Sequence, residues 1–482
     1  MTARVRPWQY YDHAVSLCPI CFRRVDAKIV FQDEAVWMLK RCPEHGATRV
    51  LVADDVDWYR RAREVFIKPA EMPCHFHTKV EHGCPYDCGL CPDHEQHSCL
   101  TLIEVGDGCN LECPVCYAES GPSRMSWHGL DVIEAMLDAV VESEGEPDVV
   151  QISGGEPTLH PDFFAILDAA KRRPIRHLML NTNGIRIARE PGFAERLAAY
   201  LPGFEVYLQF DSFEEGALRA LRGADLREIR RQALERLNEL DISTTLVVTV
   251  AKGVNDHELG RIVDHALKQP AVRGVTFQPV QAAGRLQGYD AGRNRLTLTE
   301  VRRRILEQTA VFKAEDIIPV PCHPDALGMA YALKLGGEVR PLTGLIDPRV
   351  LIEGGRNTIV FEGDEGLRKQ LFAAFSTAHS PASGFESLKS LLCCLPRLVL
   401  PSGLSYRNLF RVILMQFMDA ESFDVRSVRK TCVHIVHPED RRIIPFDTYN
   451  LFYRGDLERT RLAPLRAGVN GMDRLRQAEG LA

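Results

Sequence analysis

Three closely spaced cysteines are the residues of this chain best suited to carry chemistry. Their C-x3-C-x2-C spacing allows one loop to deliver three thiolates to a single centre, through Cys109, Cys113 and Cys116. A 4Fe-4S cluster normally takes four cysteines, so a loop with three leaves one iron open to a substrate or cosubstrate. The loop therefore predicts a catalytic 4Fe-4S cluster. The alternative is a zinc site or a set of buried thiols.

Alternating short apolar strands and amphipathic helices begin at about residue 100 and must position this loop. The pattern is typical of the α/β fold class with a mostly parallel sheet. The predicted strands are Thr101–Gly106, Val149–Ser153, His177–Asn181, Glu205–Phe210, Thr244–Val250 and Gly274–Gln278, and two of the predicted helices are Leu130–Glu142 and Leu226–Leu240. Six such repeats predict a partial (βα)6 barrel, in which chemistry takes place at the carboxyl ends of the strands.

The predicted strand ends carry the sequences GCNLEC, SGGEP, NTNG, QFDS and QPV. With Tyr117 directly after the third cysteine and SGGEP at residues 153–157, residues 100–310 resemble the radical S-adenosylmethionine (SAM) superfamily. The resemblance implies that SAM chelates the open iron and that its reductive cleavage gives a 5'-deoxyadenosyl radical, which takes hydrogen from the substrate. It also implies a low-potential electron donor such as ferredoxin or flavodoxin.

The resemblance assigns roles to individual residues of the predicted barrel. Gly154, Gly155 and Glu156 are expected to contact the methionine amino group, because glycines permit close backbone approach. Tyr117 is expected near adenine. Candidates for ribose or substrate contacts end later strands, namely Asn183, Asp211 and Gln278. For the first two of these, helix capping or turn formation is the alternative.

A second loop has the same cysteine spacing but lies before the barrel, at Cys84, Cys88 and Cys91, and Cys99 follows it. We interpret these four cysteines as ligands of an auxiliary 4Fe-4S cluster. His94 and His97 are possible substitutes for the fourth ligand. A zinc site is the alternative.

Two further cysteine turns lie near the N-terminus, in Cys18-Pro-Ile-Cys21 and Cys42-Pro-Glu-His45. Paired turns of this kind are typical of rubredoxins and zinc ribbons, so they predict a mononuclear iron or zinc site. The fourth ligand is either His45 or Cys74, and the sequence leaves both open.

The remaining four cysteines lie in the C-terminal part, at Cys322, Cys393, Cys394 and Cys432. They suggest a second auxiliary 4Fe-4S cluster, with Cys322, Cys394 and Cys432 as ligands. Since two adjacent cysteines rarely ligate together, His323, His434 or a cysteine from the N-terminal module could complete the set. Ordinary buried thiols are the alternative.

Beyond the core, the chain has an N-terminal CPxC…CPEHG module, a GCPxDCGLC segment and a stretch from Cys432 to Asn450 that resemble those of a narrower group of radical SAM enzymes. This tetraether lipid synthase group includes enzymes that join the terminal carbons of lipid chains and relatives once proposed to methylate pterin cofactors. This resemblance implies hydrogen abstraction from an unactivated carbon and coupling of alkyl chains of a lipid or other hydrophobic substrate. The alternative is C-methylation of a pterin or another small metabolite. Apolar residues 391–400 and 409–418, followed by Arg426, Arg429, Lys430, Arg441 and Arg442, could bind a lipid, or could form an ordinary core and a solvated face. A third reading is an iron-sulfur electron carrier or zinc protein.

The length and composition of the chain predict its domain organisation and its class. A chain of 482 residues predicts more than one domain, and we expect a Cys-rich metal module at 1–98, a barrel at 99–310 and a C-terminal α+β domain at 311–482. The net charge of -6, with acidic and basic residues interspersed, argues against nucleic acid as a partner. Without an apolar leader or membrane span, and with 15 cysteines grouped as for metal ligation, we expect a cytoplasmic enzyme with possible peripheral membrane contact.

Overall fold

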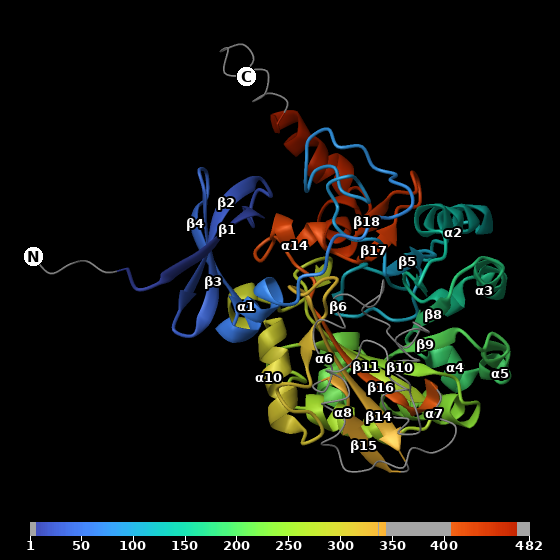
Figure 1. Ribbon diagram of the computed structural model, residues 1–482. Helices are drawn as coiled ribbons and strands as arrows, with labels where there is room; N and C mark the ends of the chain where they lie inside the picture. Colours follow the sequence, from blue (N-terminus) through green and yellow to red (C-terminus); the bar gives the residue numbers. More distant parts are fainter. Residues whose placement is uncertain (1–5, 336, 344–405, 470–482) are drawn as a thin grey trace, which may run out of the picture.

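The computed structural model describes residues 6–335, 337–343 and 406–469 (Figure 1). Its N-terminal part is a four-stranded antiparallel sheet of consecutive strands, β1 (Gln9–Leu17), β2 (Arg24–Gln32), β3 (Ala35–Cys42) and β4 (Gly46–Ala53). Buried and exposed residues alternate along β2 and β3, as expected for a sheet with one solvated face. The tight turns between its strands bring the first cysteines together.

Six parallel strands form the centre of a 12-stranded sheet in the order β5-β7-β8-β9-β10-β11. They are β5 (Leu100–Glu104), β7 (Val149–Ser153), β8 (His177–Thr182), β9 (Phe204–Gln209), β10 (Thr244–Val250) and β11 (Val272–Pro279). Every residue of β5 and β7 is buried, because parallel strands are covered on both faces. The six predicted strands and the α/β class are confirmed, and closure of the sheet into a partial barrel stays a prediction.

Helices connect these strands and cover the sheet (Figure 1). The longer ones are α1 (Val56–Glu64), α2 (Leu130–Glu144), α3 (Phe163–Lys171), α6 (Glu215–Arg222), α7 (Arg227–Glu239), α8 (Leu259–Lys268) and α10 (Leu298–Gln308), and the shorter ones are α4 (Ile185–Arg189), α5 (Phe193–Ala198) and α9 (Ala291–Asn294). Apolar side chains of the helices, such as Leu137 of α2 and Leu167 of α3, are fully buried in one large core. Among the described helices, none combines the length and apolar character needed to cross a membrane.

The C-terminal strands do not form a sheet of their own within the described residues. They are β13 (Ile318–Pro319), β14 (Leu327–Leu335), β15 (Glu338–Pro341), β16 (Leu409–Met415), β17 (Val433–Val436) and β18 (Ile443–Pro445), with the short helices α14 (Val425–Arg429) and α15 (Phe446–Thr448). Strand β16 lies parallel to β11 at one edge of the six strands, and β17 lies parallel to β5 at the other. The chain after residue 310 therefore completes the central sheet on both sides, and the predicted domain limits stay predictions.

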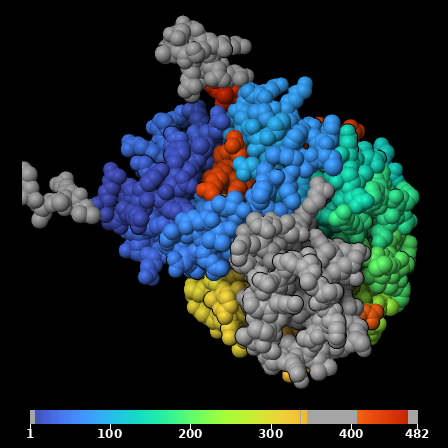
Figure 2. Space-filling view, viewed as in Figure 1, coloured from blue at the N-terminus to red at the C-terminus, as the bar shows by residue number. Residues whose placement is uncertain are grey.

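Residues 65–99 link α1 to β5 without a regular helix or strand. In the space-filling view the lighter blue residues of this segment lie at the surface between the dark blue N-terminal sheet and the cyan helices (Figure 2). A two-stranded ribbon of β6 (Val115–Cys116) and β12 (Arg285–Leu286) lies beyond the carboxyl end of β5. These irregular parts carry most of the cysteines described below.

Candidate active site and metal centres

A pocket opens at the carboxyl ends of the parallel strands, and its empty space, including the part open to solvent, is about 1050 Å³. The residues that line it and were predicted from the sequence are Cys109, Cys113, Cys116, Tyr117, Gly154, Gly155, Glu156, Asn183 and Gln278. They come from the loops after β5, β7, β8 and β11, which parallel packing brings to one edge of the sheet. Of the predicted SAM and substrate residues, only Asp211 is missing from this lining.

The three-cysteine loop is fixed by contacts at both ends. Cys109 follows β5, and its Sγ accepts a hydrogen bond from the Leu111 backbone N–H at 3.4 Å. Cys116 lies in β6, opposite Arg285 of β12, and the Arg285 Nε donates to the Cys113 carbonyl at 2.6 Å. Burial raises the pKa of the Cys109 thiol to about 12, so a thiolate there needs a cation beside it. Three such thiols lining one pocket fit the ligand set of an iron-sulfur cluster.

The glycines of SGGEP are required by contacts between the β5 and β7 loops. A Cβ on Gly155 would stand 2.1 Å from the Gly108 carbonyl oxygen, and a Cβ on Gly154 would stand 2.6 Å from that of Gly106. Gly154 also has a φ of +121°, which side chains disfavour. Close approach of two backbones therefore explains both glycines, before any cofactor contact is considered.

Glu156 joins the ends of β7 and β8. Its fully buried carboxylate accepts hydrogen bonds from the Thr158 and Thr182 hydroxyls at 2.6 and 2.7 Å, and from the Asn183 backbone N–H at 2.7 Å. Burial raises the pKa of Glu156. Asn183 in turn donates from Nδ2 to Oδ1 of Asn110 in the cysteine loop at 2.7 Å. Glu156 and Asn183 thus connect the ends of β7 and β8 to the cysteine loop.

Two arginines that the sequence analysis missed line the pocket floor. Arg222, at the end of α6, donates from Nε and Nη2 to the Asp211 carboxylate at 2.7 and 2.6 Å, and also interacts with the Cys113 thiol. Arg230 of α7 lies 3.7 Å from the same carboxylate, and its Nε and Nη2 have no hydrogen-bond partner among the described residues. Burial lowers the pKa of Arg230 to about 10.

Asp211 was predicted to contact the ribose or the substrate, but it does not line the pocket. Its side chain is fully buried, and the Thr249 backbone N–H donates to it at 3.1 Å. Burial alone would raise the pKa of Asp211. The neighbouring Arg222 guanidinium lowers this pKa by more than burial raises it, so the net shift is downward. A carboxylate enclosed by two arginines positions them and has no surface left for a ribose.

An aromatic wall closes one side of the pocket. Phe417 and Phe446 stack at 3.8 Å between ring centroids, and the Tyr117 ring meets Phe446 edge-on at 5.0 Å. All three rings line the pocket, and two of them belong to the C-terminal part of the chain. The sequence offered no signal for this wall, because Phe417 and Phe446 are brought to Tyr117 only by tertiary packing.

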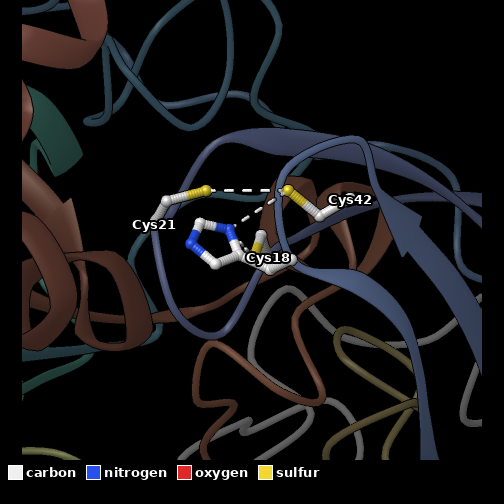
Figure 3. A group of neighbouring side chains, drawn as sticks. Cys18, Cys21 and Cys42 are labelled. Carbon is white, nitrogen blue, oxygen red and sulfur yellow. Dashed lines mark hydrogen bonds between the residues drawn. The ribbon is translucent and has the colours of Figure 1, made fainter.

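Four side chains at the tips of the N-terminal sheet gather at one point, and Figure 3 shows Cys21 and Cys42 facing each other there. The ligand atoms of Cys18, Cys21, Cys42 and His45 all lie within 4.8 Å of one another. The Cys21 and Cys42 sulfurs are 3.9 Å apart, close to the spacing of two thiolates on a tetrahedral zinc ion, about 3.8 Å for bonds of 2.3 Å. His45 therefore completes this site, and Cys74 is exposed elsewhere.

The second three-cysteine loop lies outside the pocket. The Cys84 and Cys88 thiols interact, and Cys91 lies near Cys88. The loop docks on the C-terminal region, since the Tyr453 hydroxyl accepts from the Cys88 backbone N–H at 2.9 Å and the Ile443 carbonyl accepts from Leu90 at 3.0 Å. Three thiols thus remain together here, while the fourth predicted ligand is absent from this group.

The prediction that Cys99 completes the second loop is not what the structure shows. Cys99 instead lies with Cys322 and Cys432, all three fully buried, with their sulfurs within 4.8 Å of one another. The Cys322 and Cys432 sulfurs are 3.4 Å apart, and His97 Nε2 lies 3.6 Å from the Cys99 sulfur. His94 instead contacts the Thr431 carbonyl and His434, and His323 contacts Ser427. Cys393 and Cys394 lie outside the described residues.

The apolar stretch proposed for lipid binding has another role. Residues 409–415 form β16, which is paired on both sides by β11 and β14 and carries the buried Val412 and Leu414. Among the basic residues that follow, Arg426 pairs with Asp12 at 3.0 Å and Arg442 with Asp440 at 2.7 Å. Val412 and Leu414 therefore belong to the core, whereas Phe417 of the same stretch lines the pocket, and lipid binding by this stretch stays a prediction. Residues 391–400 lie outside the described part.

Comparisons with known proteins agree with this geometry. Residues 103–266 match the model of the radical SAM superfamily, and residues 10–54 match the HMPTM N-terminal zinc ribbon domain. A 7,8-dihydro-6-hydroxymethylpterin dimethyltransferase of Methanocaldococcus jannaschii is 31% identical over 94% of this chain and 96% of its own length. The GTP 3',8-cyclase of Cronobacter sakazakii is 26% identical over 57% of this chain and 87% of its own.

Among solved structures, Streptococcus suis SuiB bound to S-adenosylmethionine is similar with a TM-score of 0.36. It is 17% identical and covers 43% of this chain and 46% of its own. A radical SAM methyltransferase from Sphaerobacter thermophilus has a TM-score of 0.29 and 12% identity, over 63% of this chain and 74% of its own.

Proposed function

Because this chain belongs to the radical SAM superfamily, within the family of the pterin dimethyltransferase that matches it nearly end to end, we propose that it is a radical SAM C-methyltransferase acting on a pterin or a similar flat heterocycle. The observation that carries the proposal is this 31% identity, which spans the metal modules as well as the core. It favours methylation over the coupling of lipid alkyl chains that the tetraether lipid synthase resemblance implied.

Superfamily membership implies a 4Fe-4S cluster and SAM, and the residues present fit both. Cys109, Cys113 and Cys116 supply three thiols at the edge of a pocket that Glu156 and Asn183 also line. When bound, these groups supply reductive cleavage of SAM and a radical able to abstract hydrogen from an unactivated carbon. Such enzymes also need an electron donor, and we propose a low-potential ferredoxin or flavodoxin.

The chain's own residues would hold SAM through complementary charges. Oε2 of Glu156 accepts a single hydrogen bond and keeps capacity for the methionine ammonium group. Arg222 and Arg230 place two guanidinium groups at the pocket floor, where a carboxylate would be stabilised in a buried setting. Asp211 holds both arginines in place. Charges of both signs thus line one pocket, as a zwitterionic ligand requires.

The aromatic wall supports a flat substrate. A pterin ring could stack on Phe417, as offset aromatic pairs do, with a gain of about 0.5–1.5 kcal/mol beyond burial. Two pocket atoms, Oε1 of Gln281 and Oγ of Ser120, are buried without a hydrogen-bond partner among the described residues. Such atoms could bond the amide and amino edge of a pterin. A long alkyl chain would leave them unpaired at a cost of about 1–3 kcal/mol each.

The other cysteines are proposed to hold auxiliary centres. Cys84, Cys88 and Cys91 form one group, and Cys99, Cys322 and Cys432 form another to which His97 could contribute. Both lie outside the pocket lining, so we propose that they pass or store electrons and do not bind SAM. The N-terminal site with Cys18 and His45 is proposed to hold zinc or iron with a structural role.

The test is an anaerobic assay of the reconstituted protein with a strong reductant, 7,8-dihydro-6-hydroxymethylpterin and SAM carrying a deuterated methyl group. The expected products are 5'-deoxyadenosine and a methylated pterin, and the label shows whether SAM donates the methyl. Deoxyadenosine without any change in pterin mass would reject the pterin substrate, and coupled chains in a lipid extract would restore the lipid function.

A pair of variants tests the wall itself. Phe417→Leu keeps an apolar side chain but removes the ring, so it should raise KM for the pterin several-fold while leaving uncoupled SAM cleavage unchanged. Phe213→Leu is the matched control, because Phe213 packs against Phe210 outside the pocket. It should leave both quantities unchanged.

A further inference from the structure

Three metal-ligating side chains outside the active site meet at the surface of the irregular segment. His75 and His77, from the sequence Cys-His-Phe-His, lie beside Glu142 near the end of α2. One ligand atom from each residue lies within 4.8 Å of the other two. The His75 and His77 rings are 4.8 Å apart between centroids, and Nε2 of His75 is 3.9 Å from Oε1 of Glu142. Neither the pocket nor the predicted clusters make use of this group.

The backbone around the two histidines is fixed to the helix that carries the carboxylate. The Cys74 backbone N–H donates to the Ser143 carbonyl at 2.6 Å. The Ser143 hydroxyl, fully buried, donates back to the His75 carbonyl at 3.4 Å. Since Ser143 directly follows Glu142, these bonds hold the histidines beside the Glu142 carboxylate. The ligand group therefore rests on a tethered backbone.

The electrostatic setting favours a cation. The carboxyl end of a helix carries partial negative charge, and the last turn of α2 contains no basic residue. Glu144, the next carboxylate on the helix, is bonded to His97 and Ser98 and so lies in another contact. Glu142 remains exposed beside the histidines. A cation placed there would neutralise charge that no basic side chain of this turn offsets.

His77 supplies the strongest sign of a missing ligand. Its Nε2 is shielded from solvent and has no hydrogen-bond partner among the described residues. A buried nitrogen without a partner is unfavourable, and a bound metal ion would satisfy it.

We propose that His75, His77 and Glu142 form a surface binding site for a divalent transition metal ion, most suitably Zn²⁺. Two imidazoles and one carboxylate are a ligand set that zinc accepts, with solvent completing the coordination. The ion would link residues 74–77 to α2. Residues 65–99 lack regular structure and carry Cys84, Cys88 and Cys91, so this link would restrict the movement of the second cysteine loop.

The test measures metal content of the full-length holoprotein. Wild-type protein with its clusters assembled is equilibrated anaerobically with micromolar Zn²⁺ and analysed for zinc and iron by mass spectrometry. Glu142→Gln and His75→Ala, both changes at exposed side chains, should each hold one zinc ion per chain fewer, with iron content unchanged. His13→Ala, at another exposed histidine beside a carboxylate, is the matched control and should keep the wild-type zinc content.

A second readout separates binding from folding. Limited trypsin digestion should cut at Lys79 more slowly when Zn²⁺ is present in the wild type, and Zn²⁺ should have no such effect in Glu142→Gln. Equal zinc content in wild type and both variants would overturn the proposal. So would a zinc difference that tracks loss of iron, since that would place the ion at another cysteine site.

Discussion

The chain contains the same cysteine spacing twice, at Cys84–Cys91 and at Cys109–Cys116, and the two loops have different surroundings. The later loop follows a buried parallel strand, and the glycines at 154 and 155 pack against it. The earlier loop lies in a segment without regular structure and is held by single hydrogen bonds, such as that from the Cys88 N–H to Tyr453. The later loop borders the pocket described above, and the earlier loop does not line that pocket.

The difference teaches that spacing sets which cysteines can share a centre, while the scaffold sets what the centre can do. Both loops can bind iron or zinc by their thiols alone. An open coordination position is useful only where arginines, a carboxylate and an aromatic wall surround it, as they do around Cys113. We therefore expect mutations in the two loops to separate SAM cleavage from later steps.

The largest expected effect is in the pocket loop. Cys113→Ala removes one of the three thiols that line the pocket, so it should abolish SAM cleavage. The measurement is 5'-deoxyadenosine formed with excess reductant. Cys74→Ala, which removes an exposed cysteine outside the pocket, should retain wild-type cleavage. Cleavage by Cys113→Ala at an appreciable fraction of the wild-type rate would contradict the assignment of the catalytic loop.

Cys88→Ala makes the matching change in the other loop. It should lower iron content by up to about four atoms per chain and stop formation of the methylated product, yet leave deoxyadenosine formation within about twofold of wild type. The physical reason is that Cys88 contacts Cys84 and Cys91 but not the pocket. If SAM cleavage disappeared as well, the two loops would have to share one function, and the comparison would fail.

A smaller effect tests the scaffold of the pocket loop. Gly155→Ala would push a methyl group into the Gly108 carbonyl, so it should destabilise the fold by about 1–3 kcal/mol and slow cluster assembly at Cys109. Gly216→Ala, in helix α6 with open space around its Cβ position, is the control and should stabilise by about 0.5–1 kcal/mol. Thermal unfolding of both apoproteins gives the comparison, and equal midpoints would contradict the close packing.

The smallest effect concerns the docking of the earlier loop. Tyr453→Phe removes a hydroxyl that accepts from the Cys88 N–H and donates to the Tyr86 carbonyl at 2.9 Å. We expect a loss of about 1–2 kcal/mol in stability and faster loss of iron from the auxiliary centre, without change in SAM cleavage. Tyr10→Phe, at an exposed tyrosine, serves as the reference. Unaltered iron retention would show that Tyr453 does not hold this loop.

Local pattern was enough to predict the central strands and most of the pocket. Strands of alternating βα units carry continuous apolar runs, so Val149–Ser153 and Thr244–Val250 could be bounded to the residue. Loops that end parallel strands meet at one edge, so Cys109, Glu156 and Gln278 could be grouped without coordinates. In each case the signal lies within a few residues of the functional side chain.

The misassigned parts depend on contacts between distant residues. Cys99 joins Cys322 and Cys432, although the nearest cysteines along the chain are those of the second loop. Arg222 stands among several arginines of α6 and α7, and only the folded structure shows that it reaches Asp211 and Cys113. No spacing rule links such residues, so sequence patterns alone could not identify them.

The placement of β17 beside β5 has a consequence for biosynthesis. Strand β5, which leads into the catalytic loop, obtains one neighbour from β7 but the other only from Val433–Val436. The nascent chain must therefore leave the ribosome as far as residue 436 before this edge is closed and before Cys432 can meet Cys99. Such distant pairing slows folding and exposes intermediates. Metal loading at the buried thiol centre must accordingly follow synthesis of both parts of the chain, and the unfinished chain presents oxidisable cysteines that need protection until then.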